Sequence, residues 1–93
     1  MRVIKNMQIS NLLNLGIQAA NIQDYKLAEK YFSDIINLDN KNENAYYNRA
    51  TSKYKLTMYK EAIEDYDKAI ELNPNKAENY FGKATSYSEI RTL

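Results

Sequence analysis

The sequence contains no cysteine and no histidine. Without cysteine the chain cannot form a disulfide, a thiolate zinc site or a cysteine nucleophile. Without histidine it lacks the general base on which most triad-type enzymes depend. These absences argue against an enzyme, and we expect no catalytic residues, no cofactor and no metal.

Glycine and proline are also scarce, with two glycines and one proline in 93 residues. So few turn-forming residues do not suit a strand-and-turn architecture. The hydrophobic fraction of 44% and the charged fraction of 27% are close to the averages of globular chains. A chain of this length forms one domain, and the composition favours a helical one.

Long apolar runs and an excess of one charge are absent as well. No run approaches the roughly 18 apolar residues of a membrane-spanning helix. The 13 basic and 12 acidic side chains leave a net charge of +1, unlike the basic surface of a phosphate-backbone binder. Asn6, Gln8 and Ser10 interrupt the apolar core that a secretion signal requires. We therefore expect a cytoplasmic protein that binds neither nucleic acid nor membrane.

What the sequence does contain is an internal repeat, because a shift of 34 residues aligns Tyr25 and Ala28 with Tyr59 and Ala62. The same shift pairs Phe32 with Tyr66, Ile36 with Ile70, Leu38 with Leu72, Tyr46 with Tyr80 and Ala50 with Ala84. The chain is accordingly divided into an N-terminal extension (1–8), a first repeat (9–42), a second repeat (43–76) and half of a third (77–93).

Each complete repeat is predicted to form two helices. Ile63, Tyr66 and Ile70 show the helical spacing of apolar residues most clearly. Asp24 and Thr57 stand where helix N-caps are expected. Residues 1–8 either extend the first helix or remain disordered. The predicted helices cover residues 9–22, 25–38, 43–56, 59–72 and 77–90.

The second repeat closely resembles a tetratricopeptide repeat. The residues that match the family pattern in type and spacing are Tyr59, Ala62, Tyr66, Ala69, Leu72 and Pro74. The first repeat matches more loosely, since Ile35 replaces a small residue and Asn40 replaces the proline. The resemblance implies an all-α fold of five helices, in which helix-turn-helix repeats stack as a short right-handed α-superhelix, a TPR-like solenoid.

The resemblance also implies a non-catalytic adaptor for protein–protein interaction, with the first helix of each repeat lining a concave groove for a peptide or protein segment. The groove positions are Leu13, Asn14, Ile17, Asn44, Tyr47, Asn48, Thr51, Tyr54, Phe81 and Thr85, with Lys55, Glu78 and Gly82 beside them. The aromatic and aliphatic members form an apolar strip. Asn14 and Asn48 carry amides that suit hydrogen bonds to a peptide backbone.

Co-chaperone members of the family hold the C-terminal carboxylates of heat-shock chaperones with a clamp of basic and amide residues. The corresponding residues here are Leu13, Ile17, Asn48, Glu78 and Gly82, of which only Asn48 fits. Glu78 would repel an acidic tail. The sequence therefore argues against a chaperone C-terminal tail as the ligand.

A second hypothesis concerns the last predicted helix. Terminal repeats normally carry a polar capping helix, whereas here Tyr80, Ala84 and Tyr87 would lose the helix that usually covers them. These residues would then pack against a second copy of the chain, in a homodimer or higher oligomer. In this alternative the protein is a self-associating structural unit.

Acidic residues gather on the predicted helix 59–72. Asp65 and Asp67 flank Tyr66, and paired carboxylates are able to perform acid–base chemistry. Their spacing from Lys60 and Lys68 is, however, typical of a solvated helix face with surface salt bridges. We therefore interpret both aspartates as surface residues.

Overall fold

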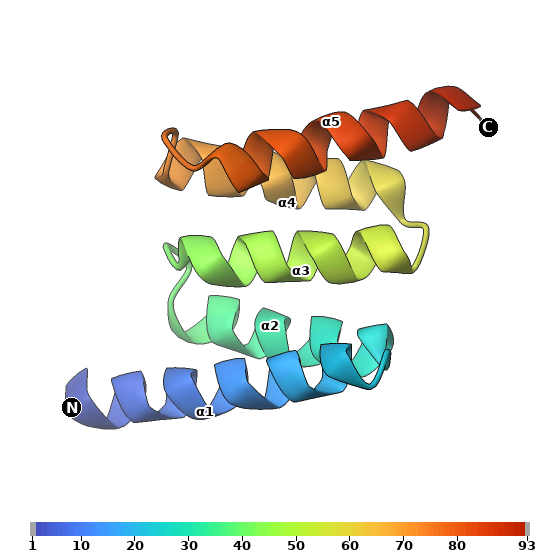
Figure 1. Ribbon diagram of the computed structural model, residues 1–93. Coiled ribbons are helices and arrows are strands. Elements are labelled where there is room, and N and C mark those ends of the chain that lie inside the picture. Colours follow the sequence, from blue (N-terminus) through green and yellow to red (C-terminus); the bar gives the residue numbers. More distant parts are fainter. Residues whose placement is uncertain (1, 93) are drawn as a thin grey trace.

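The protein is a succession of five helices, seen in a computed structural model that describes residues 2–92. The helices are α1 (Arg2–Asn21), α2 (Tyr25–Leu38), α3 (Glu43–Lys55), α4 (Tyr59–Leu72) and α5 (Ala77–Thr92). No strand occurs in the described part of the chain. Short turns reverse the chain between helices, so consecutive helices run antiparallel (Figure 1). The predicted helices 25–38 and 59–72 are confirmed to the residue.

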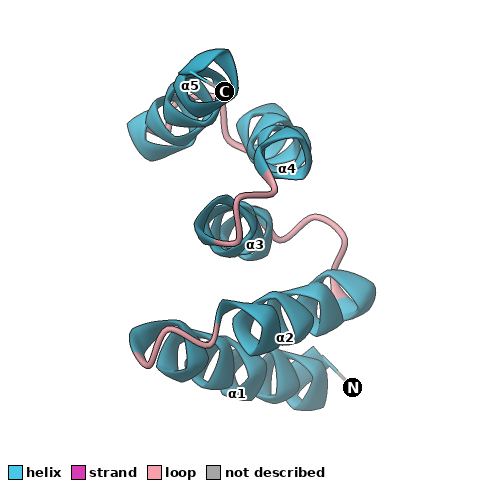
Figure 2. Ribbon diagram, turned by 90° about the vertical axis from the view of Figure 1, so that its right-hand side faces the viewer, coloured by secondary structure: helices cyan, strands magenta, loops and turns pink. Residues whose placement is uncertain are grey.

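The helices form a short stack that is 46 × 29 × 18 Å in extent. Each helix packs on the next one along the chain, and α3 also contacts α5. In Figure 2, α3 and α5 lie on the same side of the stack and α4 lies on the other. The first helices of the second and third repeats are therefore neighbours on one face of the molecule.

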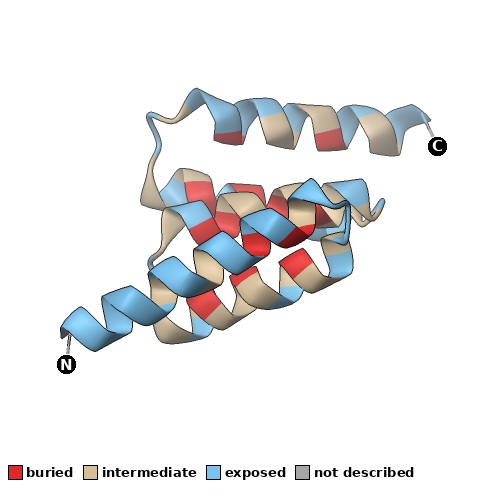
Figure 3. Ribbon diagram, turned by 60° about the horizontal axis from the view of Figure 1, so that its bottom comes forward, coloured by how far each residue is buried: buried red, intermediate tan, exposed pale blue. Residues whose placement is uncertain are grey.

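Small residues and a few large side chains make up the core. Ala28, Ala50 and Ala62 are fully buried, which lets the helix pairs approach closely. Phe32 fills the contact between α1 and α2, where Gly16 leaves room for its ring, because a Cβ at Gly16 would overlap that ring. The buried positions lie on the faces that the helices turn toward one another (Figure 3).

Residues 2–8 continue the first helix without a break, which is the first of the two alternatives predicted for the N-terminal extension. Val3, Ile4 and Met7 are exposed on this extension, which lies outside the core. Met1 and Leu93, which the predicted boundaries include, lie outside the described residues. Between residues 2 and 92, no helix has both the length and the apolar character needed to cross a bilayer.

Of the two predicted N-caps, one is confirmed and the other is wrong. Asp24 is confirmed, since its Oδ1 accepts a hydrogen bond from the N–H of Leu27 at 3.2 Å. Thr57 is not a cap, because α4 begins one residue later than that prediction requires. Met58 occupies the N-cap position of α4 and forms no capping hydrogen bond with its side chain. It is the position that aligns with Asp24 after the 34-residue shift.

Thr57 instead ends the preceding helix. Its φ of 62° places it in the left-handed region, and its N–H donates to the carbonyl of Tyr54 at 2.9 Å. The next N–H, of Met58, donates to the carbonyl of Lys53 at 2.8 Å. This pair of bonds is the Schellman arrangement, in which glycine is the usual left-handed residue.

Thr57→Gly is expected to raise the free energy of unfolding by about 1 kcal/mol, because a β-branched side chain is disfavoured at positive φ. Adding Met58→Asp should contribute about 1 kcal/mol more by supplying the missing cap. Urea unfolding followed by circular dichroism measures both changes. Thr57→Ala is the control, since it keeps the Cβ and should give little gain. A loss of stability in Thr57→Gly would show that Cβ strain is not the dominant effect in this turn.

Candidate binding groove

A pocket of about 370 Å³ opens between α3 and α5. It is lined by Tyr47, Thr51, Tyr54, Lys55, Tyr66, Ala77, Glu78, Phe81, Gly82 and Thr85. Helical spacing explains the arrangement: Tyr47, Thr51 and Tyr54 share one face of α3, and Phe81 and Thr85 share one face of α5. The structure therefore brings these five predicted groove residues together around one space.

Tyr66 enters the pocket from α4 and was not among the predicted groove residues. Its ring is reachable because Gly82 has no side chain, and a Cβ at that position would overlap the ring. The sequence indicated only that Tyr66 belongs to the repeat pattern. A glycine on α5 opposite that ring is the signal that would have revealed the pocket, but the pairing depends on how α4 and α5 pack.

Burial keeps two tyrosine hydroxyls at the pocket protonated, because it raises their pKa. The Tyr66 hydroxyl lies 3.0 Å from Oγ1 of Thr51, and its ring centroid is 6.0 Å from that of Tyr47. Burial raises the pKa of Tyr66, and the hydrogen bond with Thr51 opposes this only in part. Burial followed by the charge of Glu89 raises the pKa of Tyr54. Both phenols are therefore neutral at physiological pH, and the pocket presents mainly apolar surface.

Lys76, in the turn between α4 and α5, contacts the Tyr47 ring. Nζ of Lys76 lies 4.6 Å from the centroid of this ring, which is a cation–π distance. The same ammonium group forms a salt bridge with Glu43 at 3.1 Å. Asn79, which is fully buried, donates from Nδ2 to the same carboxylate at 3.1 Å. These contacts fix the ring at one end of the pocket.

A second pocket of about 190 Å³ lies on the other side of α3. Ile17, Asn48 and Thr51 line it together with residues of α1 and α2. Thr51 borders both pockets, so the two are separated by one row of α3 side chains. Nδ2 of Asn48 donates to the carbonyl of Asn44 at 2.9 Å, within its own helix.

The remaining predicted groove residues line neither of these pockets. Leu13 is half-buried and packs against the core between α1 and α2. Asn14 is exposed, and Oδ1 of Asn44 accepts a hydrogen bond from Lys76 at 3.1 Å. Leu13 and Asn14 lie on α1, away from the α3–α5 pocket, and Asn44 lies in the first turn of α3, where Lys76 engages its side chain.

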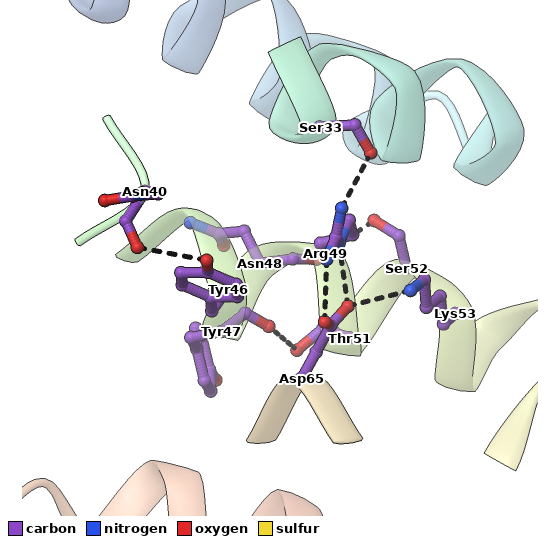
Figure 4. Close-up of polar contacts among 10 residues, drawn as sticks. All are labelled: Ser33, Asn40, Tyr46, Tyr47, Asn48, Arg49, Thr51, Ser52, Lys53 and Asp65. Atoms are coloured by element: carbon purple, nitrogen blue, oxygen red, sulfur yellow. Dashed lines mark hydrogen bonds and ion pairs between the residues drawn. The ribbon is translucent and has the colours of Figure 1, made fainter. Parts of the chain in front are cut away.

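Asp65 is not the surface residue that its spacing suggested. It is 5% exposed and faces α3, where Arg49 donates to its two oxygens at 2.8 Å each (Figure 4). Nζ of Lys53 lies 3.0 Å from Oδ2, and Nη1 of Arg49 reaches Ser33 of α2 at 3.2 Å. The hydrogen bonds with Asp65 raise the pKa of Arg49. Asp67 is half exposed, as predicted. Arg49 therefore links α2, α3 and α4, and both oxygens of Asp65 are engaged by cations of α3.

The residues of the self-association hypothesis lie on α5 and are exposed. Tyr80 is 48% exposed and its hydroxyl donates to the carbonyl of Pro74 at 2.8 Å. Tyr87 is 50% exposed, and with Ala84 it lines a separate depression whose lining residues are not those of the α3–α5 pocket.

Stacked helix pairs, with a pocket between the first helices of adjacent repeats, define a helical-repeat interaction module. The sequence profile described as "Tetratricopeptide repeat" matches residues 43–76. The TPR2B domain of yeast Sti1, solved in a complex with pHsp70, is 30% identical with a TM-score of 0.89, over 92% of this chain and 69% of that one. The protein belongs to the tetratricopeptide repeat family, and the predicted fold class is confirmed.

Two further proteins are similar to this chain. The "Protein STIP1 homolog" of Dictyostelium discoideum is 35% identical over 77 residues, which are 83% of this chain and 14% of that protein. The chain therefore spans a small part of the length of this relative. The first TPR of Spaghetti (RPAP3), bound to the HSP90 peptide SRMEEVD, shares the fold, with 20% identity and a TM-score of 0.86 over 89% of this chain and 66% of that one.

These complexes show that the argument against chaperone tails is wrong. Related domains are bound to pHsp70 and to an HSP90 peptide. That prediction rested on charge at the clamp positions, including Glu78 and Gly82 of α5, whereas Lys55 of α3 also lines the pocket. The comparisons support a protein-interaction module and give no support to self-association through Tyr80, Ala84 and Tyr87.

Proposed function

We propose that this domain is a non-catalytic adaptor that binds an extended peptide of the chaperone C-terminal class in the pocket between α3 and α5. The observation that carries the proposal is the pocket itself, whose Tyr66 floor is reachable because residue 82 is glycine. A volume of about 370 Å³ suits one or two large side chains of a peptide.

The exposure of Phe81 supports a ligand at this place. Phe81 is 75% exposed, although it is one of the two most hydrophobic aromatic side chains in the sequence. Together with Tyr47 and Tyr54 it forms an aromatic rim around a mainly apolar space. Aromatic residues around a pocket are typical of positions that supply most of the binding energy at interfaces.

The second pocket extends the surface on which a peptide would lie. Thr51 borders both pockets. A peptide that crosses α3 at Thr51 would therefore place one side chain in each pocket. The larger pocket suits a long aliphatic or aromatic side chain and the smaller one a small apolar side chain. Asn48 keeps its Oδ1 available as an acceptor, because only its Nδ2 is used within α3.

Phe81→Ala is expected to weaken binding of fluorescein-labelled SRMEEVD about thirtyfold, the effect of losing about 2 kcal/mol at a central aromatic contact. Fluorescence anisotropy at fixed ionic strength measures the dissociation constants of the two proteins. Tyr87→Ala is the matched control, because Tyr87 is an exposed aromatic residue of the same helix that does not line this pocket. Its dissociation constant should equal that of the unmodified protein.

Gly82→Ala tests the same site by filling it. Its Cβ would overlap the Tyr66 ring, so the ring must shift and the pocket must shrink. Weaker binding in both Phe81→Ala and Gly82→Ala would locate the peptide in the pocket. Unchanged binding in both would show that the peptide binds elsewhere, and no binding by the unmodified protein would exclude this class of ligand.

A further inference from the structure

The chain contains three copies of the first helix of a repeat, and in two of them the preceding helix covers one side. α3 packs on the preceding helix α2, and α5 packs on the preceding helix α4. Two repeat positions are buried in both covered copies, namely Ala45 and Ser52 of α3, and Asn79 and Ser86 of α5. In α1 the same positions are Asn11 and Gln18, and both are exposed. Between residues 2 and 92 no helix precedes α1.

One contact that occurs in both repeats shows how the preceding helix covers this side. Nη1 of Arg49 in α3 donates to Oγ of Ser33 in α2 at 3.2 Å. Exactly 34 residues later, Nζ of Lys83 in α5 lies 2.7 Å from Oδ1 of Asp67 in α4. The residue of α1 at the position of Arg49 and Lys83 is Leu15, which is 42% exposed. A helix that covered α1 in the same way would place its equivalent of Ser33 and Asp67 opposite Leu15.

Leu15 belongs to an exposed stripe along α1 that carries no charge. The members follow one another at intervals of three or four residues, which places them on one side of the helix. They are Ile4, Met7, Asn11, Leu15, Gln18 and Ile22, and we call them the outer face of α1. Its four apolar members are 42–75% exposed, and Figure 3 shows this side of α1 largely in the colour of exposed residues.

The outer face of α1 differs from the usual surface of a terminal helix. Terminal helices of repeat proteins normally present a polar side to water, but residues 6–23 contain no charged side chain. On α4, by contrast, the exposed side carries Lys60, Glu61 and Glu64. A contiguous exposed surface of apolar side chains and amides is typical of a site for another protein.

The course of α1 determines what kind of helix would cover this face. Segments 39–42 and 73–76 are the turns that connect the covering helices to α3 and α5. The equivalent segment before the first repeat is 5–8, which is helical and continues α1. A covering helix therefore cannot be joined to α1 by the turn that the chain uses twice. The same extension adds Ile4 and Met7 to the outer face.

We propose that the outer face of α1 docks an amphipathic helix of a partner protein, which packs on α1 as α2 packs on α3. The helix has an apolar residue opposite Leu15. Ser33 and Asp67 suit that position only because Arg49 and Lys83 face them, whereas a polar side chain opposite leucine would lose water without gaining a hydrogen bond. This site lies outside the α3–α5 pocket and is independent of the proposed peptide ligand.

The test uses α4 as a model of the covering helix. Two fluorescein-labelled peptides have the sequence of residues 58–73, one with Asp67 and one with Asp67→Leu. A lactam between the side chains of Glu64 and Lys68 keeps both helical. The unmodified protein should bind the leucine peptide at least about tenfold more tightly, because leucine is buried against Leu15 where aspartate loses water. Fluorescence anisotropy measures both dissociation constants.

Two variants of α1 locate the bound helix. Leu15→Lys should reverse the preference, because it recreates the ion pair between α4 and α5 with the aspartate peptide. Ile17→Lys is the matched control, since Ile17 is 41% exposed on the same helix but lines the second pocket. It should bind the leucine peptide as tightly as the unmodified protein. Circular dichroism establishes that both variants are folded.

Several results would refute the docking site. These are no binding of the leucine peptide, equal binding of the two peptides, and equal weakening of the leucine peptide by both lysine variants. Light scattering adds one more, because a dimer that Leu15→Lys dissociates would assign the outer face to a second copy. Leu15→Lys should bind SRMEEVD as the unmodified protein does, so that failure of this proposal and failure of the proposed function remain distinguishable.

Discussion

Asp65→Asn is expected to lower the free energy of unfolding by about 3–5 kcal/mol, the usual loss when one partner of a buried ion pair is removed. Asp65 is 5% exposed, and its oxygens accept two hydrogen bonds from Arg49 and contact Lys53. Asparagine keeps the size of the side chain but leaves two cations next to a neutral amide. Their side chains are 20% and 14% exposed, so water solvates them poorly. Urea unfolding followed by circular dichroism measures the loss.

Asp67→Asn provides the matched control on the same helix. Asp67 pairs with Lys83 at 2.7 Å, but its side chain is 50% exposed. An exposed pair contributes up to about 1 kcal/mol, so this variant should unfold only slightly more easily than the unmodified protein. Equal losses for the two variants would show that Asp65 behaves as a surface carboxylate, as its position in the sequence suggested.

Phe32→Ala is expected to lower the free energy of unfolding by about 3–5 kcal/mol, through lost burial and the cavity left behind. Phe32 is 1% exposed and packs with Ala19, Ile35 and Ala45 in the core of the first repeat. A domain of 93 residues has a total stability of roughly 5–14 kcal/mol. The variant should therefore lose a large part of its stability, measured by thermal and urea unfolding.

The second phenylalanine of the sequence is the control. Phe81→Ala removes the same number of atoms at a position that is 75% exposed, and should change stability by less than about 0.5 kcal/mol. Gly16→Ala should destabilise the unmodified protein, because its Cβ overlaps the Phe32 ring, but not the Phe32→Ala variant. Equal destabilisation by Gly16→Ala in both backgrounds would contradict this packing.

Most of the secondary structure could be predicted from the sequence. Apolar residues at helical spacing and the 34-residue repeat locate the helices 25–38 and 59–72 to the residue. The sequence left open whether residues 2–8 extend α1 or remain disordered, because these residues carry little periodic pattern. Thr57 was assigned to the wrong helix end, since its left-handed conformation does not follow from a threonine in the sequence.

Part of the candidate site could also be derived from the sequence. Helical register placed Tyr47, Thr51 and Tyr54 on one face of α3, and the structure has them in one pocket. Register did not reveal Tyr66, which reaches that pocket only because α4 packs against Gly82 of α5. Register also predicted that Leu13 lines the groove, as Tyr47 does, although Leu13 packs against the core.

The sequence by itself determined the class of this protein: all helical, repetitive with a period of 34 residues, and built of tetratricopeptide repeats. Those properties depend on local periodicity and on residue types at fixed spacing, which a linear chain displays directly. The tertiary structure alone decided that Asp65 is buried between two cations, and that the missing side chain of Gly82 uncovers Tyr66. Such contacts join residues on different helices. Their geometry depends on how closely the helices pack, and spacing along the chain does not specify that distance.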